Sequence, residues 1–270
     1  MKPSDLRTDS GEQSDMKLFA HQQGEGGTPV VFLHGFAGSH AVWGTIQTEI
    51  SRARQTLAYD LPGHGRSSDF PDAGPAKRAA EAIIQDLRER GIERAHLVGH
   101  SMGGAIAALI AILDVSRVAS LTLLAPGGFG PEINHRLLSR VAAADTAETL
   151  LPCLEALHGW MSPVTDEAVT TALAMRAAPG QVDVLKTIAR GLVRDGRQGQ
   201  LPRDSLDAFD MPVTVAWGEI DNVLPVRHAR YLPVQFAVHI FPDLGHMLPE
   251  EAPDAVIRII ERTIAAGDAV

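Results

Sequence analysis

The stretch that decides the fold is His96-Leu97-Val98-Gly99-His100-Ser101-Met102-Gly103-Gly104. The run 96–98 is typical of a buried strand, and the apolar residues 103–113 are typical of a helix sunk in a core. A G-x-S-x-G sequence between a strand and a helix predicts a nucleophile elbow, a tight turn that pushes the serine hydroxyl outward above a helix N-terminus. Its neighbours must be small because the turn is crowded. A glycine-rich turn that only packs the helix on the strand is the alternative.

Short apolar runs recur along the chain and predict further buried strands. Helical patterns separate them: Ala79, Ile83 and Leu87 fall at helical spacing before a C-capping Gly91, and Ile259 and Ile264 belong to a last amphipathic helix. Strand–helix alternation predicts an α/β fold with right-handed crossovers. The remaining predicted strands lie at residues 16–20, 30–33, 56–59, 121–124, 213–216 and 238–241.

One long stretch breaks this alternation. Between residues 127 and 210 no run convincingly predicts a strand, and three or four helical patterns occur instead, at 134–144, 147–161, 166–177 and 182–193. We interpret this stretch as a helical cap inserted into the fold. The predicted organisation is a flexible tail (1–15), an α/β core (16–126 and 211–270) and the cap (127–210).

The amino-acid composition excludes several classes of protein. The 270 residues contain 24 Lys and Arg against 33 Asp and Glu, a net charge of −9 that argues against nucleic-acid binding. The single cysteine, Cys153, excludes an internal disulfide framework and is expected to be a small core or pocket residue. The longest apolar run is too short for a membrane span, and residues 1–15 lack an apolar signal core. The default expectation is a cytoplasmic protein.

A serine needs a base, and the base needs an acid that fixes its tautomer. Of eleven histidines, His246 is the best candidate because it follows the last predicted strand; His34 and His64 lie in glycine-flanked turns that suggest a backbone role. Asp221, just after the strand 213–216, is the preferred acid, with Glu219 as its rival. The order Ser101, Asp221, His246 is that of the α/β-hydrolase type of triad.

The developing oxyanion needs two N–H donors. The residue after the nucleophile, Met102, supplies one. The second is expected from the loop after the strand 30–33, where we choose the N–H of Phe36.

Taken together, five motifs resemble the α/β-hydrolase superfamily over nearly the whole chain from about residue 16. The resemblance implies an α/β-hydrolase fold: a mostly parallel sheet of about eight strands with helices on both faces and a helical cap over Ser101. The cap and C-terminal half are similar to the hydrolase-like domain of acetoin dehydrogenase acyltransferase chains, although the H-x-x-x-D-G acyltransferase motif is absent. The motifs are His34-Gly35-Phe36, Asp60-Leu61-Pro62-Gly63-His64-Gly65-Arg66-Ser67, Gly99-His100-Ser101-Met102-Gly103-Gly104, Trp217-Gly218-Glu219-Ile220-Asp221 and Gly245-His246.

The expected function is a cofactor-independent serine hydrolase, with no metal, that cleaves an ester or thioester of a small to medium acyl group through an acyl-enzyme. Its partner would be a small molecule, and Trp160, Met161 and Met247 are expected to bind it. Serine at position 101 excludes the carboxylate nucleophile of dehalogenases and epoxide hydrolases. The first alternative is a C–C bond hydrolase acting on a diketone or ring-cleavage product, which Met247 disfavours because such enzymes often carry an aromatic residue there. The second is a non-catalytic binding module of an acyltransferase complex.

Overall fold

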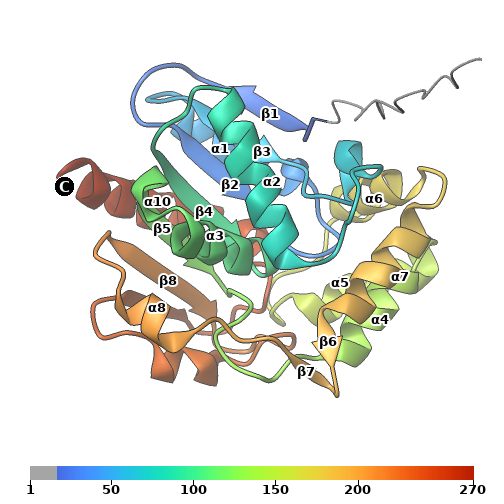
Figure 1. Ribbon diagram of the computed structural model, residues 1–270. Coiled ribbons are helices and arrows are strands. Elements are labelled where there is room, and N and C mark those ends of the chain that lie inside the picture. The colour runs from blue at the N-terminus through green and yellow to red at the C-terminus, as the bar shows by residue number, and fades with distance from the viewer. Residues whose placement is uncertain (1–16) are drawn as a thin grey trace, which may run out of the picture.

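Seven strands form one sheet in the computed structural model, which describes residues 17–270 (Figure 1). Their spatial order is β1-β3-β2-β4-β5-β8-β9. All neighbours pair in parallel except β1, which is antiparallel to β3 at one edge. The strands are β1 (Ala20–Gln23), β2 (Val30–Leu33), β3 (Thr56–Tyr59), β4 (Ala95–His100), β5 (Val118–Leu124), β8 (Val213–Gly218) and β9 (Ala237–Phe241).

Helices cover both faces of this sheet, and alternate side chains of each strand feed the two cores. In β2, Val30 and Phe32 pack with α1 and α10, whereas Val31 and Leu33 pack with α2 and α3. α3 is apolar nearly all round because it lies directly on the central strands. These helices are α1 (Gly44–Ile50), α2 (Ala76–Glu89), α3 (Met102–Leu113) and α10 (Pro253–Asp268). The predicted C-cap of α2, Gly91, has a left-handed φ of 70°.

Residues 127–210, which we call the helical segment, lie between β5 and β8 in the chain and beside the sheet in space (Figure 1). α4 contacts both α5 and α7, and α6 contacts the same two helices. Two short strands form a hairpin that the sequence did not predict. The elements are α4 (His135–Ala143), α5 (Ala147–Leu157), α6 (Asp166–Arg176), α7 (Gln181–Gly191), β6 (Val193–Arg194), β7 (Arg197–Gln198) and α8 (Arg203–Asp207).

Three expectations need correction or qualification. The sheet has seven strands in the described residues, where about eight were expected. The predicted strand 16–20 begins only at Ala20, and residues 1–16, including the predicted tail, lie outside the described residues. α5 ends at Leu157 rather than residue 161, because the chain turns there to pack on the loop that carries His246.

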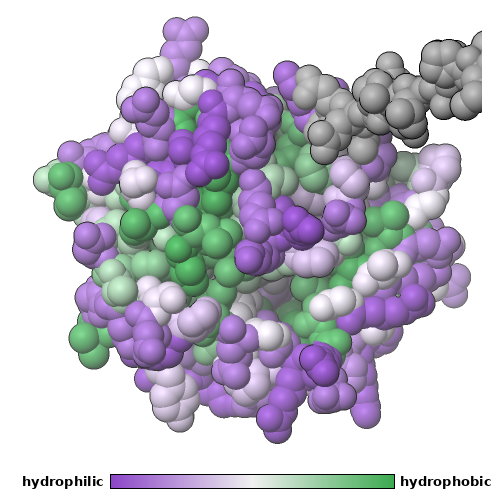
Figure 2. Space-filling view, in the orientation of Figure 1, coloured by the Kyte–Doolittle hydropathy of each residue, from purple (hydrophilic) through white to green (hydrophobic). Residues whose placement is uncertain are grey.

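No helix among residues 17–270 is long and apolar enough to cross a bilayer. The face in Figure 2 is largely hydrophilic, with hydrophobic side chains at the surface over α3. Leu113, the last residue of α3, and Val115, just after it, are about half exposed.

Close approach of α3 to β2 depends on Gly103. A Cβ at this position would lie 2.2 Å from the Leu33 carbonyl oxygen, which is rigid backbone. We therefore expect Gly103→Ala to lower the free energy of unfolding by about 3 kcal/mol, as overpacking of a core does. Urea denaturation measures this loss.

The matched control is Gly191→Ala, at the last residue of α7, where a Cβ would meet nothing within 4 Å. This variant should be neutral or slightly stabilising. Equal stability of the two variants would contradict the packing argument.

Candidate active site

Ser101 occupies a strained turn between β4 and α3. Its φ of 53° and ψ of −116° lie outside the regions that a non-glycine residue normally adopts. The surroundings force this shape: the Ser101 N–H donates to the Leu124 carbonyl, and the Ser101 carbonyl accepts from three N–H groups that follow it or lie after β5. A Cβ at Gly99 would lie 2.4 Å from the Gly103 carbonyl oxygen. The turn therefore has the geometry of the elbow that the sequence predicted.

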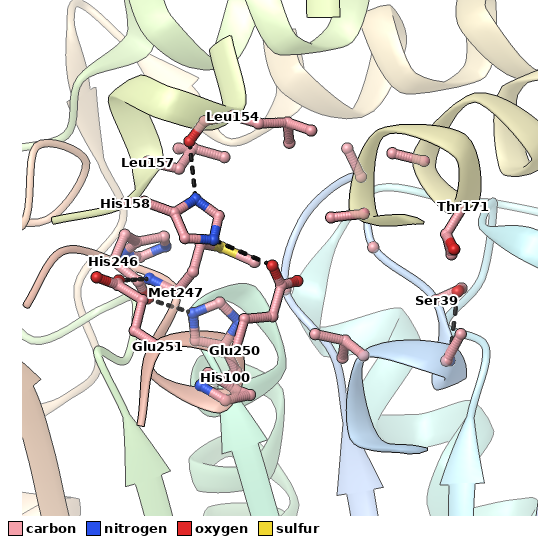
Figure 3. Close-up of a pocket in the computed structure, with 18 of the residues that line it drawn as sticks. Ser39, His100, Leu154, Leu157, His158, Thr171, His246, Met247, Glu250 and Glu251 are labelled. Carbon is pink, nitrogen blue, oxygen red and sulfur yellow. Dashed lines mark hydrogen bonds and ion pairs between the residues drawn. The ribbon is translucent and has the colours of Figure 1, made fainter. Parts of the chain in front are cut away.

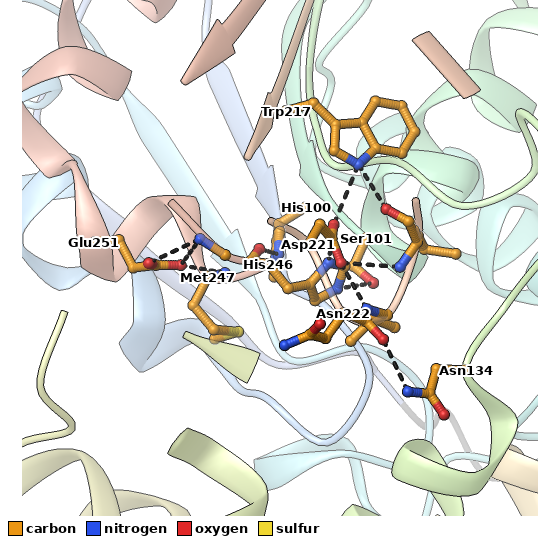
Figure 4. A network of polar contacts seen from close by, with 12 residues as sticks. His100, Ser101, Asn134, Trp217, Asp221, Asn222, His246, Met247 and Glu251 are labelled. Carbon is orange, nitrogen blue, oxygen red and sulfur yellow. Dashed lines mark hydrogen bonds and ion pairs between the residues drawn. The ribbon is translucent and has the colours of Figure 1, made fainter. Parts of the chain in front are cut away.

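Three predicted side chains meet at this turn (Figure 4). His246 Nε2 lies 2.9 Å from Ser101 Oγ, and His246 Nδ1 lies 2.7 Å from Asp221 Oδ2. If the ring proton sits on Nδ1, facing the carboxylate, Nε2 is free to accept the serine proton. The three groups are brought together because β4, β8 and β9 are parallel and end at the same edge of the sheet.

Asp221 is held by several donors, whereas its rival is not in the site. The Val223 and Leu224 N–H groups donate to Asp221 Oδ1 at 2.7 and 2.9 Å, and the Trp217 indole N–H donates to Oδ2 at 3.2 Å. The Asp221 side chain is fully buried. Glu219 is exposed and contributes nothing to this network. The geometry favours Asp221 as the acid.

The loop after β2 lies against the candidate nucleophile. A Cβ on Gly35 would sit 3.2 Å from Ser101 Cβ and 2.9 Å from His100 Nδ1, so the loop passes the hydroxyl closely. Within residues 17–270, neither the Phe36 N–H nor the Met102 N–H has a hydrogen-bond acceptor. Both donors that the sequence singled out are therefore available to a ligand.

Two buried histidines fix this loop through their side chains. The His34 ring bonds the Gly35 carbonyl and accepts from the Leu61 N–H; the His64 ring bonds the Pro62 carbonyl and accepts from the Ala37 N–H. Burial lowers the pKa of His34 to about 4 and, with repulsion from His34, that of His64 to about 3. Neutral rings with one donor and one acceptor nitrogen are what these bonds require. The sequence had indicated only a backbone role for both residues.

A cavity of about 660 Å³ opens above Ser101, between the carboxyl edge of the sheet and the helical segment (Figure 3). Core loops supply one side of it, including Ser39, Ser101 and His246. The helices α4, α5 and α6 supply the other side, with Thr171 facing across the cavity in Figure 3. The wall mixes apolar side chains, among them Leu138, Val141, Leu154, Leu157 and Met175, with a few polar ones.

The three residues predicted to bind the substrate differ in their position relative to the cavity. Met247 lines the cavity beside His246. Met161 also lines it but is 82% exposed, so it lies at the rim. Trp160 is 89% exposed and lies outside the lining, which corrects its assignment to the pocket; α5 has already ended, and the indole points to solvent. Cys153 is buried, with its thiol donating to the Thr149 carbonyl, as expected of a core residue.

Sequence reasoning missed the polar groups that the helical segment and α9 (Leu248–Glu251) place around the cavity. His158 bonds Glu250 at 3.1 Å and the Leu154 carbonyl at 2.8 Å; burial opposes its charged form, but these bonds raise the pKa of His158. Glu251 accepts from the N–H groups of Gly159, Gly245 and Met247. The His158–Glu250 and Gly159–Glu251 contacts each join residues that are 92 positions apart, so no local sequence pattern predicts them.

Arg176 is a further residue of the cavity wall that the sequence did not single out. An arginine at the end of a helix is normally read as a solvated cation that complements the helix dipole. Here only 6% of the residue is exposed, and burial lowers the pKa of Arg176 to about 10. Among residues 17–270, no group of three or more His, Cys, Asp or Glu side chains is arranged to hold a metal ion.

A family model described as the alpha/beta hydrolase family matches residues 30–259. The dihydrolipoyllysine-residue acetyltransferase component of the acetoin cleaving system from Pseudomonas putida is 35% identical over 233 residues, which are 86% of this chain and 62% of the relative. The chain thus spans about three fifths of the length of that curated relative.

Two other proteins match over nearly their whole length. The 2-hydroxy-6-oxononadienedioate/2-hydroxy-6-oxononatrienedioate hydrolase of Cupriavidus pinatubonensis is 25% identical over 263 residues, 92% of this chain and 90% of the relative. The structure of the meta-cleavage product hydrolase from Pseudomonas fluorescens IP01 matches with a TM-score of 0.82 at 21% identity, over 94% of this chain and 95% of that one. The structural match shows a shared fold.

The buried histidines make stability depend on pH. Burial, together with repulsion from His246, lowers the pKa of His100 to about 3, well below its unfolded value of 6.5. The unfolded chain therefore binds a proton that the folded chain does not, and the contribution of His100 to stability is lost as pH falls below 6.5. His100→Gln keeps an amide N–H that can donate to the His246 carbonyl, as the His100 ring does at 2.8 Å.

Between pH 7 and 5, we expect the wild type to lose about 2 kcal/mol more stability than His100→Gln does. Urea denaturation at several pH values measures the difference, and the plateau between pH 7.5 and 8.5 serves as the reference because the imidazole is neutral there in both states. Parallel pH profiles would mean that His100 is protonated in the folded protein.

Proposed function

This chain belongs to the alpha/beta hydrolase family, and we propose that it is a cofactor-independent serine hydrolase that cleaves an ester or thioester of a small to medium acyl group. The observation that carries the proposal is the continuous hydrogen-bonded path from Ser101 through His246 to Asp221 at the floor of a cavity. A buried serine hydroxyl that donates to a carboxylate-oriented imidazole is set up for nucleophilic attack.

In the proposed reaction, His246 Nε2 takes the proton of Ser101 as Oγ attacks the substrate carbonyl carbon. Asp221 keeps the imidazole in place and stabilises its positive charge. His246 then gives the proton to the departing alcohol or thiol, which leaves an acyl group on Ser101. A water molecule activated by the same imidazole releases the acid and restores the serine.

The negative charge on the carbonyl oxygen would be stabilised by the N–H groups of Phe36 and Met102. Both are unpaired within the described residues, and the loop that carries Phe36 is fixed by neutral His34 and His64, so these donors need not reorganise during the reaction. One such donor typically contributes about 10²- to 10³-fold in rate.

We propose further that the helical segment acts as the cap of the site. It provides the far wall of the cavity, and it is bonded to the catalytic loops: the His246 N–H donates to the Leu157 carbonyl, and the Asn222 amide donates to the Ala156 carbonyl. The cap would exclude water and select the acyl group.

A second candidate is C–C bond hydrolysis with the same three residues. The relative from Cupriavidus pinatubonensis, a hydrolase of 2-hydroxy-6-oxo acids by its name, matches over nine tenths of both chains. Met247 replaces the aromatic residue expected after the histidine of such enzymes, and we therefore rank this candidate second.

Replacing the nucleophile tests the proposal. Ser101→Ala should lower the turnover of p-nitrophenyl butyrate by about 10⁴-fold or more, because the attacking oxygen is gone, and should abolish labelling by a fluorophosphonate probe. The matched control is Ser162→Ala, which removes another serine of the cavity lining and should keep turnover within about threefold. Full activity in the Ser101 variant would refute the triad; an unlabelled wild type would favour a binding module.

A panel of substrates separates the two reactions. We expect the wild type to cleave p-nitrophenyl butyrate and its thioester analogue faster than a vinylogous diketone acid of the ring-cleavage type. The measurement is kcat/KM for each substrate. A ratio that favours the diketone by tenfold or more would reverse the ranking of the candidates.

A further inference from the structure

Arg176 is a buried cation without an anionic partner among residues 17–270. Its terminal nitrogens donate to the carbonyl oxygens of Ala172 at 2.7 Å and Val141 at 3.2 Å, and its Nε N–H has no acceptor. Within residues 17–270 it forms no ion pair with a carboxylate. Carbonyl oxygens satisfy hydrogen bonds but do not neutralise a charge, and an uncompensated buried charge is destabilising. Keeping the Arg176 charge buried therefore lowers the stability of the folded protein.

Arg176 is also the only Lys or Arg in the described lining of the cavity. The carboxylates of the lining are committed elsewhere. Glu250 bonds His158, and Glu251 accepts from three backbone N–H groups. Glu167 is exposed, where water screens its charge. An anion that enters the cavity would therefore find one strong partner.

The position of Arg176 relates it to the acyl side of the site. The residues of α6 that line the cavity recur at helical spacing, and Arg176 falls four residues after Ala172 on that face. Its neighbour Met175 packs against the same buried cluster, Ala142, Leu185 and Ala189, as Phe36 and Ala37 do, and these two lie on the loop that carries a candidate oxyanion donor. The leaving group must lie near His246, which protonates it. Arg176 lies close enough to His64, which accepts from the Ala37 N–H, for its charge to lower the pKa of that ring, so it is on the side of the loop after β2, where the acyl chain would extend.

We propose that Arg176 binds a carboxylate on the acyl part of the substrate, so that the preferred substrates are half-esters or half-thioesters of dicarboxylic acids. This inference rests on the proposed function. Carbonyl oxygens use one N–H of each terminal nitrogen of the guanidinium, and Nε is buried, so the second N–H of each terminal nitrogen remains for a carboxylate, which these paired donors match in geometry and charge. The exposed Arg190 and Arg194 lie outside the lining.

The kinetic test compares mono-p-nitrophenyl glutarate with p-nitrophenyl pentanoate, which has a neutral acyl chain of the same length. The wild type should favour the glutarate ester by about tenfold or more in kcat/KM. Arg176→Met should lose about 10- to 100-fold on the glutarate ester, mainly through KM, and stay within about threefold on the pentanoate ester. Arg176→Lys should recover part of the preference because it keeps the charge, and Arg190→Met should behave as wild type.

A binding test does not depend on turnover. By calorimetry, the Ser101→Ala protein should bind glutarate at least tenfold more tightly than the neutral glutaramide, and addition of Arg176→Met should abolish this difference. If Arg176→Met weakens both esters equally, or if glutarate and glutaramide bind alike, the inference is overturned, and Arg176 only ties α6 to α4. If the wild type cleaves neither ester but binds glutarate through Arg176, the proposed function fails and the anion site stands.

Discussion

The close contact between β4, α3 and β2 is the constraint on which the site depends. Ser101 keeps a left-handed φ only because the chain on either side of it has no freedom to relax: Gly103 touches the carbonyl of Leu33, and Gly104 touches Pro126. The same contact that strains the turn brings the loop after β2 against the serine. Packing of the core and placement of the candidate oxyanion donors therefore depend on the same contact.

Around this turn, the chain uses neutral histidines as structural elements. His34, His64 and His100 are all fully buried, and each holds a loop at the carboxyl edge of the sheet by one ring nitrogen or both. An imidazole suits this place because a single neutral ring can donate on one side and accept on the other. The condition is that the rings remain uncharged, so the rigidity of the loops is linked to pH.

The features that could be predicted from the sequence are those that local sequence patterns encode. The strands β2 and β3, the elbow and the order of the candidate triad follow from short motifs that each fix their own geometry, and their meeting point follows from the parallel order of the strands. Trp160 was misplaced because the end of α5 at Leu157 is set by contact with His246, 89 residues away in the chain, and not by a local stop signal. Arg176 was missed because its burial depends on α4, which covers it from outside its own helix.

The difference between features encoded by local motifs and features set by long-range contacts explains why the motifs identify a family more readily than a substrate. The groups proposed for bond cleavage come from the ends of β2, β4, β8 and β9, where strain and close packing allow few alternatives. The wall opposite them comes from α4, α5 and α6, which pack on one another and join the loop of His246 by single hydrogen bonds such as the one that the Leu157 carbonyl accepts. A change on α6 can therefore alter the charge of the pocket without disturbing the path from Ser101 to Asp221. Arg176 is a cation that its surroundings do not neutralise. Residues of this kind in the cavity wall would give members of one family different substrate specificities.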